Sequence, residues 1–185
     1  MALLILGMVI FLSAHLMPSF VELRRKLVDR KGETVYLICY SLVSALGLGL
    51  VIAGKATAPD VPIWEAPRWM NHLTMTAMLA AVILLAAAYI PNNLRRFVRH
   101  PFLWGFTLWA FSHLIVSGDL GSLILFGGIG AFALFDMWSA NRRGAQNSDK
   151  KVPFYMDVLL ISVGLFAYGV ISYVHPNLFG VSVLP

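Results

Sequence analysis

Long apolar runs follow one another along this chain and leave no room between them for a large water-soluble domain. Each run is close to the roughly 20 residues that an α-helix needs to cross the hydrocarbon core of a bilayer. Only 12% of the residues are charged, whereas 59% are hydrophobic. We therefore predict an all-α polytopic membrane protein, a bundle of about six transmembrane helices that forms a single domain over residues 1–185. The runs lie at about residues 2–20, 36–54, 70–90, 101–117, 120–139 and 152–174.

Lysine and arginine residues gather in alternate loops of this pattern. Twelve of the 14 follow the first, third and fifth runs, and only Lys55 and Arg68 lie on the other side. Cytoplasmic loops of membrane proteins carry the excess of these residues, so we predict that both termini are non-cytoplasmic. The net charge of +5 then reflects topology and contact with the lipid bilayer. No base-reading motif accompanies the basic loops, so we expect no nucleic-acid partner.

Residues 94–119 combine a basic cluster, a helix that starts at a proline, and a histidine inside an apolar run. Pro101 suits the first turn of a helix, where a missing backbone N–H costs nothing. His113 is the one side chain between Pro101 and Val116 that ionises near neutral pH. Unpaired imidazole nitrogens in hydrocarbon are costly, so His113 is a candidate functional residue. The alternative is a structural histidine bonded to the backbone of a neighbouring helix.

The first two apolar runs carry a second candidate histidine and a packing face. Helical spacing places His15 on one face of the first run with Met8, Phe11 and Leu12. The alternative for His15 is an interfacial residue that bonds Ser19 or lipid headgroups. Small residues in the second run, among them Ser41, Ser44, Ala45, Gly47 and Gly49, suit close helix packing. Cys39 is the only cysteine, and we expect it to be a small buried apolar residue.

Three aspartates near the ends of the last two runs are assigned structural roles. Asp119 is well placed to cap the helix that follows it. Asp136 and Asp157 lie inside the apolar runs, where acids usually pair with a partner. We expect them to form a salt-bridge cluster with the basic side chains on the same side, Arg99, His100 and Arg142.

A series of short motifs, spread over nearly the whole chain, resembles the NnrU family of integral membrane proteins. The most specific block runs from R-H-P-F-L-W-G through H-L to G-D. The matching residues are His15, Pro18 and Ser19; Leu23 to Arg25; Gly32 and Glu33; Tyr89 to Pro91; Arg99 to Gly105; Leu108 to Ala110; His113 and Leu114; and Gly118 and Asp119.

This resemblance implies a cofactor and two ligands. The family is associated with denitrification gene clusters and is homologous to the 15-cis-zeta-carotene isomerases, which are similar membrane proteins that bind haem b. When the motifs are matched residue by residue, the two histidines that ligate haem in the isomerases correspond to His15 and His113. His100 matches a histidine that is not a ligand, and Ala110 stands where the isomerases have a cysteine. The family also implies the inner membrane of a bacterium.

The expected depth of each residue in the bilayer favours His72 or Met8 over His15 as the second haem ligand beside His113. From the expected helix ends, His15 and His113 differ in depth on the order of 10 Å, so a tilted haem or a tilted helix would be needed. His72 and Met8 match the depth of His113 better, and histidine–methionine ligation is a known haem arrangement. Because expected helix ends and tilts shift by several residues, the family resemblance outweighs the depth argument. The cofactor-binding prediction remains His15 and His113, with an aromatic face of Phe102, Phe106 and Trp109 beside His113.

Three function classes follow from these observations. The first is a haem-binding membrane protein linked to redox or nitric oxide metabolism, with a small gas ligand. The second is a haem-dependent isomerase acting on a hydrophobic polyene. The third is a cofactor-free assembly factor or transporter, although the chain shows no convincing internal repeat. No catalytic pair is evident from the spacing of the ionisable residues, and the oligomeric state does not follow from the sequence.

Overall fold

The computed structural model describes residues 1–181 and 183, and the regular structure in this part of the chain is helical. Two short 3₁₀ turns, Met17–Ser19 and Leu94–Arg96, lie between the helices. The helices are α1 (Ala2–Leu16), α2 (Val21–Lys31), α3 (Glu33–Ala56), α4 (Met70–Ala87), α5 (Pro101–Val116), α6 (Leu120–Arg142) and α7 (Phe154–Phe179).

The predicted all-α membrane bundle is confirmed. Five of the helices, α1, α3, α4, α6 and α7, are long and apolar enough to cross a membrane. The fourth apolar run, residues 101–117, forms α5, whose 16 residues extend about 24 Å along the axis. Many large apolar side chains on the outside of the bundle are exposed, as expected where lipid covers them.

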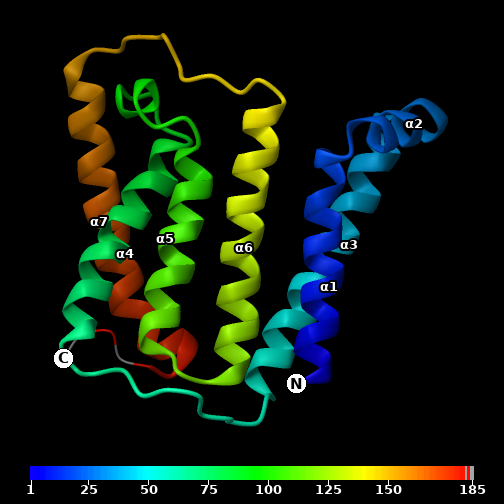
Figure 1. Ribbon diagram of the computed structural model, residues 1–185. Coiled ribbons are helices and arrows are strands. Elements are labelled where there is room, and N and C mark those ends of the chain that lie inside the picture. Colours follow the sequence, from blue (N-terminus) through cyan, green and yellow to red (C-terminus); the bar gives the residue numbers. More distant parts are fainter. Residues whose placement is uncertain (182, 184–185) are drawn as a thin grey trace.

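The helices form two groups that meet at α6. α1 and α3 pack tightly against each other, while α4 packs against both α5 and α7, and α5 packs against α6 (Figure 1). Contacts between α6 and the α1–α3 pair are fewer. The start of α1 and the end of α7 lie at one end of the bundle, and α2 lies at the other (Figure 1). We call the end with α2 and the loops 88–100 and 143–153 the basic end, and the end with loop 57–69 the opposite end.

Glycines bring the backbones of α1 and α3 into contact. A Cβ at Gly54 would overlap the backbone nitrogen and Cα of Leu4, and a Cβ at Gly47 would lie 2.7 Å from the nitrogen of Phe11. The prediction of a small-residue packing face is therefore confirmed at Gly47. Gly49 differs, because nothing lies within 4 Å of a Cβ added there. Cys39 is exposed on α3, so the expectation of a small buried residue is wrong.

Loop 57–69 is held against the turn between α5 and α6. The nitrogens of Ile63 and Trp64 donate to the carbonyl oxygen of Gly118 at 2.6 and 3.1 Å, and Leu120 N donates to Val61 O at 2.9 Å. A Cβ at Gly118 would overlap the carbonyl oxygen of Trp64, so only glycine permits this approach. The proline-rich loop is thus fixed by backbone hydrogen bonds, although it contains no helix.

Asp119 links the two helix groups at the opposite end. Its Oδ1 accepts from Ser122 N at 2.9 Å, so the predicted helix cap is confirmed. The Nζ of Lys55, in the last turn of α3, also donates to Asp119 Oδ1 and to Ser122 Oγ, each at 2.8 Å. Burial alone would raise the pKa of Asp119, but the hydrogen bonds from Lys55 and Ser122 outweigh it and lower the pKa from 3.8 to about 2.

Replacing Asp119 by asparagine should make stability less sensitive to acid. Because the folded-state pKa of Asp119 is depressed, its contribution is present above pH 4 and is lost as the pH falls towards 2. At pH 7 we expect Asp119→Asn to lower the free energy of unfolding by about 1–2 kcal/mol, through loss of the charged hydrogen bonds. The loss is measured by comparing the thermal unfolding temperature Tm of the wild type and of Asp119→Asn at pH 7 and at pH 3. An equal drop in Tm for both proteins on acidification would contradict it.

Asp157 and Asp136, near the helix ends at the basic end, are held by different partners, an asparagine and an arginine. Asp157, in the first turn of α7, accepts from Asn93 N at 2.7 Å and from Asn93 Nδ2 at 2.6 Å. Asp136 lies 3.8 Å from Arg143 and accepts from Ser19 Oγ at 3.3 Å. The expected salt-bridge cluster with Arg99, His100 and Arg142 is therefore wrong, because Arg99 and His100 both donate to the same amide oxygen, Asn141 Oδ1.

Candidate functional site

A row of aromatic side chains runs along one face of α5. Phe102, Phe106, Trp109 and His113 are separated by four, three and four residues, which places them one above another on a helix. Successive ring centroids lie 4.9, 6.0 and 5.0 Å apart. The structure thus brings together the four residues of α5 that the sequence singled out.

His113 ends this row and has one nitrogen fixed by the backbone. Its Nδ1 lies 2.8 Å from the carbonyl oxygen of Trp109, one helical turn earlier. A carbonyl oxygen can only accept, so Nδ1 carries the proton and Nε2 keeps its lone pair. Phe126 of α6 stacks on the imidazole, with ring centroids 4.6 Å apart and planes inclined by 26°. His113 is half-buried, and no hydrogen bond to its Nε2 is present in the described part of the chain.

His175 of α7 lies beside His113. The two ring centroids are 6.4 Å apart, and the ring planes are inclined by 33°. Nδ1 of His175 lies 2.9 Å from the carbonyl oxygen of Val181, so this imidazole also keeps its proton on Nδ1. The ring of Phe179 packs against it at 4.8 Å.

His175 lies one residue beyond the last apolar run, residues 152–174, so the pattern of that run does not select it. The helix continues to Phe179 through Pro176. The available signal was depth: a histidine after about 20 residues of the last run must lie at the same end of the bundle as His113.

His15 lies in a different part of the molecule. It is one residue from the end of α1 at the basic end, whereas His113 is three residues from the end of α5 at the opposite end (Figure 1). Its Nδ1 donates to Phe11 O at 2.8 Å, and its ring faces Tyr40 of α3 at 5.7 Å and Phe132 of α6 at 6.1 Å.

The neighbours on α6 show how far apart the two candidate ligands are. Phe126, which stacks on His113, and Phe132, which faces His15, are six residues apart, or about 9 Å along the helix axis. Six residues also turn a helix by about 240°, so these two phenylalanines point to different sides of α6. The structure therefore does not bring His15 and His113 together.

The rings recorded against His113 among the described residues are those of Trp109, Phe126 and His175, and no other histidine named from the sequence is among them. His72 is exposed at the start of α4. Met8 is buried in the α1–α3 pair and points at Gly128 of α6. His100 lies at the basic end, where its Nε2 bonds Asn141 Oδ1 at 2.9 Å.

The opposite end holds two imidazoles whose spacing would suit a metal ion held between them. Two imidazoles on one iron place their ring centres roughly 6 Å apart, since a metal–imidazole bond is about 2 Å long. The 6.4 Å between His113 and His175 agrees with this spacing. Among the described residues no group of three or more histidine, cysteine or acidic side chains could hold a bare metal ion. Two imidazoles alone would leave four positions of a six-coordinate iron for other ligands, which the four nitrogens of a porphyrin would supply.

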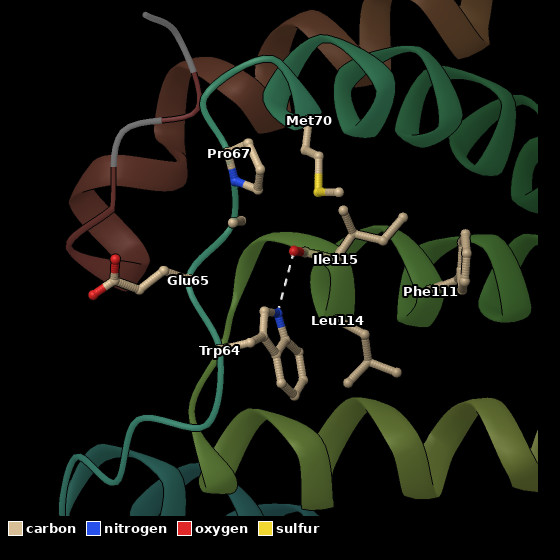
Figure 2. Close-up of a pocket in the computed structure, with 8 residues that line it drawn as sticks. Trp64, Glu65, Pro67, Met70, Phe111, Leu114 and Ile115 are labelled. Atoms are coloured by element: carbon tan, nitrogen blue, oxygen red, sulfur yellow. Dashed lines mark hydrogen bonds between the residues drawn. The ribbon is translucent and has the colours of Figure 1, made fainter.

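An apolar cavity of about 320 Å³ lies under loop 57–69. Figure 2 shows Trp64, Met70, Leu114 and Ile115 around it, with Glu65 pointing away from the cavity. The indole Nε1 of Trp64 donates to Ile115 O at 3.4 Å and so ties the loop to α5. Its α5 residues lie on the face of the helix away from the aromatic row, so a molecule held there would not reach His113.

Comparison with known proteins gives one match. A family model described as NnrU protein matches residues 3–183. No curated protein and no solved structure matches the chain.

Proposed function

The chain belongs to the NnrU family, and on that premise we propose that it is a membrane protein that binds haem b with His113 as an iron ligand. The single observation that carries this proposal is the state of His113. Its imidazole is half-buried among aromatic rings, its Nδ1–H is bound to a backbone carbonyl, and its Nε2 has no hydrogen-bond partner in the described residues. Metal-ligating histidines typically have this arrangement.

The aromatic row supports the same proposal. Phe102, Phe106 and Trp109 present apolar ring faces along α5 up to His113, and Phe126 adds another from α6. Such side chains provide an apolar, water-poor wall for a flat hydrophobic cofactor, and the polarity of this wall tunes the iron. A bound haem would supply redox chemistry or a site for a small gas molecule, while the chain's own residues bind it and limit access of water.

A role in redox or nitric oxide metabolism follows from the family resemblance. Isomerisation of a polyene is the alternative that the resemblance also implies, but the cavity under loop 57–69 does not favour it. That cavity opens on the face of α5 away from His113, so a polyene held there would not meet the iron. We therefore place redox or gas-linked function first.

An absorption spectrum tests the proposed function. The full chain, purified in detergent from cells that make haem, should show the Soret and visible bands of haem b, and dithionite should sharpen and shift them. The pyridine haemochrome method then gives the haem content per chain. Protein that carries no haem, and takes up none when haemin is added, would overturn the proposal.

The structure and the charge pattern support an orientation in the membrane. Twelve of the 14 lysine and arginine residues belong to the basic end, which we place in the cytoplasm of a bacterial cell. Reporter fusions after Lys31, Asn93 and Gln146 should then be cytoplasmic, and a fusion after Pro59 should be external. If the fusion after Gln146 reported an external location, the six-helix topology would be contradicted.

A further inference from the structure

We infer that His175 of α7, rather than His15 of α1, is the second iron ligand and pairs with His113. This inference rests on the proposed function, because it assumes that a haem is bound. It names a residue that neither the motifs nor the family resemblance selected.

The first support is that both imidazoles use Nδ1 in a hydrogen bond to a backbone carbonyl and leave Nε2 free of one among the described residues. Nδ1 of each ring donates to a backbone carbonyl, Trp109 O for His113 and Val181 O for His175, at 2.8 and 2.9 Å. Such bonds fix the tautomer and leave the lone pair of Nε2 for a metal. The ring centroids are 6.4 Å apart, which agrees with two imidazoles on opposite sides of one iron.

The second support is position along the bundle. α5 and α7 both run from the basic end to the opposite end, and each carries its histidine within the last five residues of the helix. His113 and His175 therefore lie at similar depth. His15, by contrast, lies near the basic end and faces a different side of α6. For His15 and His113 to share an iron, the two helix groups would have to move relative to each other.

The third support is the surrounding chemistry. α6 contributes Phe126, which stacks on His113, and α7 contributes Phe179, which packs on His175. The contacts recorded for both rings are with aromatic groups or backbone carbonyls, and no carboxylate or lysine contacts either imidazole among the described residues. Two neighbouring imidazoles without an acid between them have no ion-pair role, whereas a metal between them satisfies both Nε2 atoms.

The experiment compares His175→Ala with His15→Ala in the full chain, purified with haem in detergent. Two protein ligands give a six-coordinate low-spin iron, which absorption and electron paramagnetic resonance spectra identify. We expect His175→Ala to lose the low-spin signal and to regain it when free imidazole is added. We expect His15→Ala to keep the wild-type spectrum.

A second variant separates ligand loss from misfolding. His175→Met should remain a monodisperse protein and give a low-spin spectrum distinct from the wild type, because a thioether can take the same axial position. If His175→Ala kept the wild-type spectrum while His15→Ala lost the low-spin signal, this inference would be overturned and the proposed function would stand. A wild-type protein that binds no haem would overturn the proposed function itself.

Discussion

Replacing Gly54 by leucine should lower the free energy of unfolding by about 2–3 kcal/mol, because any side chain there meets the backbone of α1. A Cβ at this position would overlap the nitrogen and Cα of Leu4, and helix backbone cannot yield as a flexible side chain can. The α1–α3 pair would have to separate, and the buried side chains of Leu4 and Val51 would lose their packing contacts. For a chain of this size the change corresponds to a Tm lower by about 4–12 °C.

Gly49→Leu is the matched control for this prediction. It lies on the same helix and changes the helix propensity in the same way, but nothing lies within 4 Å of its added Cβ. Thermal unfolding of both variants in the same detergent, followed by the loss of the monodisperse peak in size-exclusion chromatography, measures the difference. Equal Tm values for the two variants would show that the close approach of α1 and α3 does not stabilise the protein.

Replacing His113 by alanine should reduce the haem content of the purified protein at least tenfold. This imidazole is the proposed ligand at the end of the aromatic row, and even changes to groups that only orient a metal ligand cost about 10–100-fold in metal affinity. Haem content per chain, measured as pyridine haemochrome, gives the result directly.

His100→Ala is the control for the haem prediction. His100 belongs to the same R-H-P block of the sequence, but it lies at the basic end and bonds Asn141. We expect this variant to keep its haem and its six-coordinate low-spin spectrum. If His100→Ala lost haem and His113→Ala retained it, the site would lie at the basic end, and His113 would be a structural residue that caps its own helix turn.

The candidate site could be predicted only in part. The spacing of Phe102, Phe106, Trp109 and His113 on α5 could be read from the sequence, because side chains three and four residues apart always share a face of a helix. The partner of His113 could not be read in this way. Whether His15, His72, Met8 or His175 faces it depends on which helices are neighbours, and the apolar runs alone do not specify their order in the bundle.

The depth estimate from the sequence concerned His15 and His113 alone. It indicated that His15 lies too far along its helix to match His113, and the contacts of Phe126 and Phe132 on α6 agree. It could not reveal His175, because the last apolar run of the sequence ends at residue 174, ahead of Pro176. Proline in a helix removes one backbone hydrogen bond, but the final turn of α7 accommodates it and continues to Phe179.

The sequence by itself determined that this protein is a bundle of apolar helices, since a run of about 20 apolar residues crosses lipid as a helix, which satisfies its backbone hydrogen bonds within itself. It also determined the segregation of basic loops, the cap at Asp119 and the aromatic face of α5, which are all local patterns. Only the tertiary structure decided that α6 separates His15 from His113, that α7 places His175 beside His113, and that Asn93 rather than an arginine binds Asp157. The physical reason is that these contacts join residues far apart in the chain, and the same apolar surfaces allow several helix arrangements. Close approach at a few positions, such as Gly54 against Leu4 and Gly118 against Trp64, selects among the arrangements.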